Sequence, residues 1–97
     1  ESVMPLDYLL HQNYPNPFNP VTDIRYDIPD NAQVSIIIYD VMGRKVRSLV
    51  NKKQVAGFHH TQWDGKNDLG TPIASGMYVY MLKAGHHISA KKMVMLK

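Results

Sequence analysis

Turn-forming residues interrupt this chain about every eight to twelve positions, and the segments between them alternate apolar and polar side chains. Within residues 22–28, for example, Ile24, Tyr26 and Ile28 alternate with charged residues. A repeat of two residues is typical of a strand with one buried face. The spacing of an amphipathic helix is found in no window. The sequence therefore predicts an all-β domain.

The alternating segments and the turns between them predict about seven strands, at residues 8–14, 22–28, 34–39, 45–50, 58–63, 77–83 and 87–96. The strand at 45–50 is basic and is expected near a sheet edge, where lysine opposes pairing with another chain. Short, uneven connections and a single large indole favour two packed sheets over a closed barrel. We predict an immunoglobulin-like antiparallel β-sandwich with Greek-key connections.

The same alternation predicts which side chains form the core. One face of residues 34–39 carries Ser35, Ile37 and Tyr39, so the face turned away from the core is also partly apolar. The expected core consists of Ile24, Tyr26, Val34, Ile36, Ile38, Trp63, Tyr78, Tyr80 and Leu82.

The length of 97 residues fits one domain, with residues 1–7 as a linker from an upstream domain and residues 8–97 as the domain itself. No apolar run has the length of a transmembrane helix, and the acidic start lacks the basic region of a secretory signal. An exported role would therefore require this sequence to be a fragment of a larger protein whose export signal lies upstream.

Charge and cysteine content exclude several functions. The net charge is +3, and the lysines and arginines are spread along the chain rather than gathered among exposed aromatics. We therefore expect no nucleic-acid binding. The absence of cysteine excludes a disulfide scaffold, a cysteine-ligated zinc site and thiol catalysis.

No group of residues matches a catalytic constellation. Ser75-Gly76 lacks the Gly-x-Ser-x-Gly elbow, and no helix is expected after it. The eight acidic residues fall mostly in turns and on polar strand faces, without a cleft between them. A chain of this size also leaves little room for a deep cleft. The expectation is a protein that is not an enzyme and needs no cofactor.

Two kinds of metal site deserve consideration. His59-His60 and His86-His87 are adjacent pairs, and neighbours on a strand point to opposite faces, so ordinary surface histidines are favoured over a zinc site. The segment 64–70 resembles an oxygen-rich calcium loop but lacks the spacing and terminal glutamate of an EF-hand. We favour a turn held by side-chain to backbone bonds from Asp64 and Asn67, and keep Asp64, Asn67 and Asp68 as weak calcium candidates.

Aromatic side chains could instead form a sugar-binding platform. Trp63 ends a strand before a turn, a common place for a buried indole, and Tyr78 and Tyr80 share a face with Leu82. Core packing is favoured for at least three of the candidates Trp63, Tyr39, Tyr78, Tyr80 and Phe58.

A proline-rich stretch precedes the alternating segment at 22–28. Pro15, Pro17 and Pro20 remove three backbone donors, so this stretch is not a central strand. We expect a rigid, ordered loop whose asparagine side chains bond to local backbone.

Several ordered motifs cover about nine-tenths of the chain. They are Asn13-Tyr14-Pro15-Asn16-Pro17-Phe18-Asn19-Pro20, Thr22-x-Ile24-x-Tyr26, residues 38–46, Ala56-Gly57-x-His59, Trp63-Asp64-Gly65, Ser75-Gly76-Met77-Tyr78 and residues 91–97. Together they resemble the type A C-terminal sorting domain of the type IX secretion system. The Trp-Asp-Gly and Ser-Gly-x-Tyr segments are shared with a related Ig-like module of flagellar hook-capping proteins, and the proline-rich opening favours the sorting domain.

The resemblance implies an Ig-like domain at the C-terminus of exported proteins. An outer-membrane translocon would recognise it after it folds in the periplasm, and a surface sortase would then commonly remove it. The cargo, an upstream domain of the same chain, would reach the cell surface or the medium. The family's recognition motifs correspond here to Gly76, Tyr78, Lys91, Lys92, Met93, Val94, Met95, Leu96 and Lys97.

A terminal strand could be recognised by strand addition, with backbone bonds to a partner. Two alternatives remain open, namely a carbohydrate-binding accessory module and a structural spacer in a multidomain enzyme. In each case we expect a monomeric domain.

Overall fold

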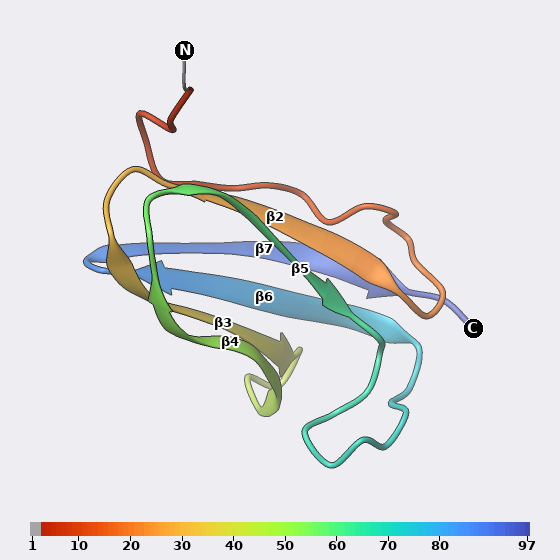
Figure 1. Ribbon diagram of the computed structural model, residues 1–97. Coiled ribbons are helices and arrows are strands. Elements are labelled where there is room, and N and C mark those ends of the chain that lie inside the picture. The colour runs from red at the N-terminus through yellow and green to blue at the C-terminus, as the bar shows by residue number, and fades with distance from the viewer. Residues whose placement is uncertain (1–2) are drawn as a thin grey trace.

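The computed structural model describes residues 3–97, and these form two antiparallel sheets packed face to face (Figure 1). The first sheet has the strand order β1-β2-β5 and the second the order β4-β3-β6-β7. The strands are β1 (Leu9–Leu10), β2 (Thr22–Ile28), β3 (Ala32–Asp40), β4 (Lys45–Gln54), β5 (Gly57–Trp63), β6 (Gly76–Ala84) and β7 (His87–Met95). The predicted all-β, seven-stranded Ig-like sandwich is confirmed.

The chain crosses between the sheets after β2, after β4 and after β5, as expected for Greek-key connections. Strand β4 is a sheet edge, as its lysines predicted. Two register irregularities separate it from β3, at Ile36/Ile37 and Ile38/Tyr39. Such bulges twist an edge strand and make it a poorer template for another chain.

All nine residues predicted for the core are buried. Both sheets contribute to this core, because every second side chain of each strand points toward the opposite sheet. Ile28 of the same alternating segment is buried as well, and residues that the alternation did not single out complete the core: Leu10, Phe18, Val50, Ala84, Met93 and Met95.

The first predicted strand is much shorter than expected. Only Leu9–Leu10 pair continuously with β2, and Tyr14 forms one isolated bridge with Asp23. The prolines that follow lack the N–H groups a strand needs, and the side chain of Asn13 points into the interior instead of continuing the ladder.

Of the predicted linker, residues 1–2 lie outside the described residues. Pro5 is buried, and Tyr8 stacks on His87 with ring centroids 4.9 Å apart. Within residues 3–97 there is no helix long and apolar enough to span a bilayer.

Candidate functional site

Trp63 lies at the end of β5 and is fully buried between the sheets. Its ring contacts Phe18 from the proline-rich loop and Tyr78 from β6, each with ring centroids 5.6 Å apart. The indole Nε1–H donates to the Lys66 carbonyl at 2.9 Å, so its one polar atom is satisfied. Three motifs that are far apart in the sequence therefore meet at this indole.

The glycine that follows Trp63-Asp64 has a specific role in this meeting point. Gly65 has φ of +75°, a left-handed conformation. A Cβ added there would lie 3.0 Å from the Met95 sulfur and 3.1 Å from the Pro20 carbonyl oxygen. Both the backbone conformation and the close contact with two other motifs require glycine.

The proline-rich loop is tied to the core through Asn13. Its buried side-chain amide donates to the Thr22 hydroxyl at 3.0 Å and to the Pro15 carbonyl at 3.2 Å. Its backbone N–H donates to the Tyr80 hydroxyl, which in turn donates to the His11 carbonyl at 2.7 Å. Burial raises the pKa of Tyr80 to about 12. The prediction of an ordered loop held by asparagine side chains is confirmed.

The same loop pairs with the end of β7 (Figure 1). The Phe18 N–H donates to the Val94 carbonyl at 3.0 Å, and the Leu96 N–H donates to the Phe18 carbonyl at 2.8 Å. The Val94 N–H donates to the Asn16 side chain, and the Gln12 amide donates to the Lys92 carbonyl. The expectation that the terminal strand offers its edge for strand addition is wrong for residues 92–96, because the loop already occupies that edge.

The recognition residues divide by exposure. Tyr78, Met93 and Met95 are buried, and Gly76 pairs with Met95 across the sheet. The Tyr78 hydroxyl donates to the Ala74 carbonyl at 2.5 Å, and its pKa is raised by burial and then by nearby Asp40. The side chains of Tyr78, Met93 and Met95 belong to the core and are inaccessible to a partner of the folded domain. The exposed members are Gly76, Lys92, Leu96 and Lys97, with Lys91 and Val94 half-buried.

The segment 64–70 has the turn structure that was favoured over a calcium loop. The side-chain oxygen of Asn67 accepts from the backbone N–H groups of Leu69 and Thr71, each at 3.0 Å, and the Asp64 carboxylate accepts from the Lys66 N–H at 3.1 Å. Asp64 and Asp68 also approach the Arg47 guanidinium at 3.3 and 3.8 Å. The carboxylates thus have cationic and backbone partners already.

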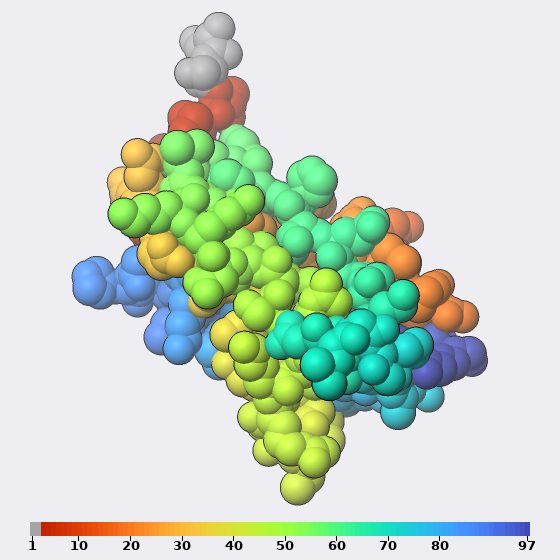
Figure 2. All heavy atoms as spheres, turned by 60° about the horizontal axis from the view of Figure 1, so that its bottom comes forward, coloured from red at the N-terminus to blue at the C-terminus, as the bar shows by residue number. Residues whose placement is uncertain are grey.

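This segment packs beside the projecting tip of the β3–β4 hairpin (Figure 2). Asp68 accepts from the Ser48 N–H of β4 at 3.0 Å. At the tip, Val41 and Met42 are exposed, and the backbone N–H of Arg44, with the Arg44 side chain, lowers the pKa of Asp40.

The histidines are dispersed in the structure. His59 bonds to the Val55 carbonyl at 2.7 Å and stacks on Tyr26, and His11 pairs with Asp27 at 3.1 Å. His86 lies in the turn before β7 rather than on a strand. Within residues 3–97 no three histidine or acidic side chains are grouped so as to hold a metal ion.

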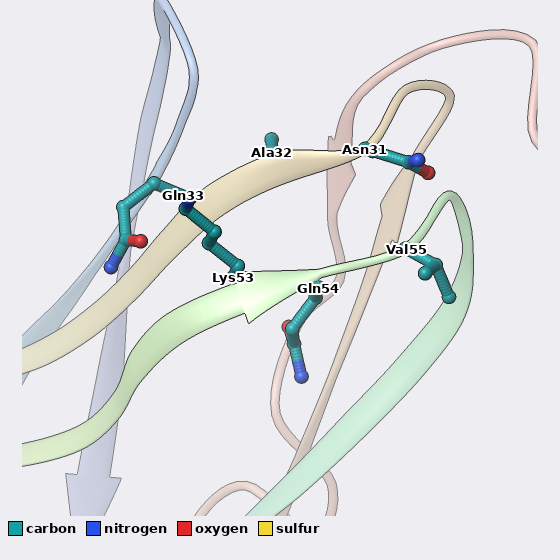
Figure 3. Close-up of a pocket in the computed structure, with 6 residues that line it drawn as sticks. All are labelled: Asn31, Ala32, Gln33, Lys53, Gln54 and Val55. Atoms are coloured by element: carbon teal, nitrogen blue, oxygen red, sulfur yellow. The ribbon is translucent and has the colours of Figure 1, made fainter.

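The carbohydrate-binding alternative loses the residues on which it was based. Trp63, Tyr78 and Tyr80 are buried and cannot stack on a sugar, whereas Tyr39 is half-buried and Phe58 exposed. A shallow pocket of about 380 Å³ lies between the start of β3 and the end of β4 (Figure 3). Two of its polar side chains already have partners, since the Asn31 side chain accepts from the Ala56 N–H and the Gln54 side chain accepts from the Tyr26 hydroxyl.

Sequence reasoning missed the residues that join the loop to the strands. Tyr80 was assigned to the core for its ring alone, and Gln12 and Thr22 were not singled out. Thr22 could have been found, because it occupies a buried position of the alternating strand and a buried hydroxyl needs a partner.

Comparison with known proteins agrees with this architecture. Latent dimeric PorU from Porphyromonas gingivalis matches with a TM-score of 0.69 and 25% identity over 93% of this chain and 9% of its own. PorZ, a surface component of the type-IX secretion system of that organism, matches with a TM-score of 0.61 and 20% identity over 93% of this chain and 11% of its own. The chain thus spans about a tenth of either protein.

A search of curated protein sequences found no match. The family model described as the FlgD Ig-like domain matches residues 20–86, which is more than half of the chain, and the chain therefore belongs to the FlgD Ig-like domain family.

Proposed function

We propose that this domain is a type A C-terminal sorting domain of a type IX secretion system. In this role it directs a larger exported protein across the outer membrane to the cell surface or the medium. Its partners are the outer-membrane translocon, a surface sortase and the cargo domain of its own chain. It passes through the periplasm in transit, and it acts by being recognised rather than by catalysis.

The observation that carries the proposal is that several of the motifs shared with the sorting domain meet at one end of the sandwich. Phe18, Trp63 and Tyr78 are in ring contact, and Gly65 lies against Met95. A spacer needs only a stable core. Here the motifs instead hold the last strand in a fixed position, with its backbone bonded to the loop and its outer side chains exposed.

The solved structures add independent support. PorZ belongs to the type-IX secretion system, and the aligned region of PorU is 25% identical to this chain over 93% of the chain. In both, the matching region is about a tenth of the protein, which suits a module attached to a larger cargo.

The structure suggests which residues a translocon or sortase would contact. Because the strand edge at 92–96 is covered, recognition would use the side chains of Lys92, Leu96 and Lys97 rather than backbone pairing. Deleting Met95 to Lys97 is a poor test, because Met95 is 1% exposed and its loss would also damage the core.

A sharper experiment fuses the domain behind a fluorescent cargo with its own export signal in a cell that has a type IX system. The test variants are deletion of Leu96–Lys97 and Lys92→Ala. We expect the cargo of these variants to accumulate in the periplasm, whereas the unaltered fusion reaches the surface or the medium.

The matched control is Lys52→Ala, an exposed lysine on the opposite edge strand β4. Exposed lysines contribute little to stability, so Lys92→Ala and Lys52→Ala should melt within a few degrees of the original. The deletion also removes the Leu96 N–H that donates to the Phe18 carbonyl, so the same melting measurement must show that this variant is still folded. Surface delivery of the Leu96–Lys97 deletion at the normal level would contradict the sorting role and favour a structural spacer.

A further inference from the structure

The two central strands of the four-stranded sheet are apolar on both faces. Their inward residues form the core, as expected for one face of an antiparallel sheet. Outward, β3 carries Ile37 and Tyr39, and β6 carries Val79 and Met81, all half-buried by their neighbours. In an antiparallel sheet with one face in solvent, the outward residues are usually polar, so the apolar outward residues of β3 and β6 depart from that pattern.

The strand register makes these residues contiguous. Ile37 lies opposite Met81, which lies opposite Ala90 on β7, and Tyr39 lies opposite Val79. Met77 and Val94 extend the same surface by one further pair. A shallow groove of about 530 Å³ runs along it, bordered by Tyr39, Val41, Val79, Met81 and Lys83, with Asp40 and Gly43 at its end.

The charges that this sheet directs to its outer face are lysines. Opposed residues of neighbouring strands point to the same side. The register therefore directs Lys92 with Val79, Lys83 with Ser35 and Lys53 with Gln33 to this face. Lys45, opposite Tyr39, lies at the edge of the face and pairs with Asp68 at 3.9 Å.

No carboxylate points outward from these strands. Asp40 stands at the hairpin end, and its oxygens are taken by Arg44 and the Met42 N–H. The outer face of the three-stranded sheet, by contrast, mixes Asp23, Arg25 and Asp27.

We propose that this outer face is a docking surface for a polypeptide that presents apolar side chains flanked by carboxylates. The apolar centre supplies the area to be removed from water, and the lysines select an acidic partner. A second copy meeting the same face would bring lysines against lysines. A lipid surface would favour projecting apolar side chains, whereas the central four here are half-buried between their neighbours. The proposal does not depend on the sorting role.

The test uses the isotope-labelled chain and a synthetic peptide in which glutamate alternates with valine and leucine. Two further peptides carry glutamine or lysine in place of every glutamate. We expect the glutamate peptide to shift the amide signals of Tyr39, Val79 and Met81. It should bind about tenfold more tightly than the glutamine peptide, and its affinity should fall in high salt.

The test variant is Lys83→Glu, and the matched control is Lys52→Glu, which makes the same charge change on a lysine directed away from the face. Lys92 stays unaltered because it belongs to the proposed recognition strand. We expect Lys83→Glu to lose several-fold in affinity for the glutamate peptide and Lys52→Glu to keep it. Equal binding of the glutamine peptide, or amide shifts mapping elsewhere, would overturn the proposal.

Two further measurements separate the other possible occupants. If sedimentation equilibrium shows a dimer, and the conservative change Val79→Thr dissociates it, the occupant of the face is a second copy of the chain and not an acidic partner. Binding to phosphatidylglycerol vesicles without binding to the glutamate peptide would replace it by a lipid surface. A monomer that binds the peptide and not the vesicles supports the proposal.

Discussion

At the scale of single residues, the conformation of the N-terminal loop depends on groups that are satisfied only inside the fold. The Tyr80 hydroxyl is the clearest case, since it accepts from the Asn13 N–H and donates to the His11 carbonyl. Its ring is fully buried. The hydroxyl therefore links β6 to the segment before the prolines, and its ionisation should weaken that link.

The raised pKa of Tyr80 predicts a loss of stability in alkali. Below pH 10 the hydroxyl is protonated in both states, so its contribution is fully present. As the pH rises toward its folded pKa of about 12, the unfolded chain releases the proton first, and the free energy of unfolding falls by roughly 2–3 kcal/mol. Burial also raises the pKa of Tyr26 and Tyr78, which act in the same direction.

Urea unfolding across this alkaline range checks the prediction. Tyr80→Phe should be less stable at neutral pH by about 1–3 kcal/mol, because two backbone groups lose their partner. The free energy of unfolding of Tyr80→Phe should fall less steeply with rising pH than that of the original chain. Parallel declines in the two proteins would show that Tyr80 does not carry the effect.

Comparing substitutions at two glycines separates the cost of backbone strain from the cost of a packing clash. Gly65 and Gly70 have φ of +75° and +80°, so alanine at either position is strained. Only at Gly65 would the new methyl group meet other atoms, those of Met95 and Pro20. We expect Gly65→Ala to destabilise the domain by about 1–3 kcal/mol more than Gly70→Ala, measured by denaturant unfolding. Equal losses would mean that Met95 and Pro20 move aside freely.

At the scale of elements, the proline-rich loop and β7 behave as one unit. The loop supplies acceptors and a donor to the outer edge of the last strand, which would otherwise be unpaired. The proline-rich loop near the start of the chain is therefore joined to the last strand. This contact explains why a stretch without regular structure is nevertheless well ordered.

Removing one of these acceptors should loosen one amide. In Asn16→Ala the Val94 N–H loses its partner, so its hydrogen exchange should accelerate about fivefold or more. The Leu96 amide should change little, because its acceptor is the Phe18 backbone carbonyl. Equal acceleration at both amides would instead indicate that the whole loop detaches.

The loop at 64–70 should not respond to calcium. Asp64 and Asp68 already interact with Arg47 and with backbone donors, so an incoming cation would have to displace them. The melting temperature in millimolar calcium should equal that in chelator, because only a ligand that binds the native state raises it. A calcium-dependent rise of several degrees would identify a metal site here.

At the scale of the whole molecule, Trp63 joins the two sheets and the proline-rich loop. It extends from the first sheet, and its neighbours are a loop residue and a residue of the second sheet. With no other indole present, its fluorescence reports on the meeting point of all these parts.

Unfolding should therefore be a single transition. Trp63 fluorescence and far-ultraviolet circular dichroism should give the same midpoint in denaturant, as expected for a small domain with one core. An earlier fluorescence transition would show that the loop and β7 open before the sheets separate.

The sequence by itself determined the turns, every strand after the first, and the side of those strands that is buried. These follow from local alternation and turn chemistry, because a strand points its side chains to opposite faces wherever it lies. For that reason all nine core residues, the edge position of β4 and the Asp64–Asn67 turn could be predicted.

Only the tertiary structure decided what the loop and the last strand do to each other. The contacts of Phe18 with Val94 and of Gly65 with Met95 join residues far apart in the chain, and no local pattern encodes such a pairing. For this reason the suggestion that the terminal strand could be recognised by strand addition does not hold for residues 92–96. The lysine-bordered outer face likewise became visible only through the register. A strand's periodicity says which side is buried, but the neighbouring segment decides which edge and which face remain available.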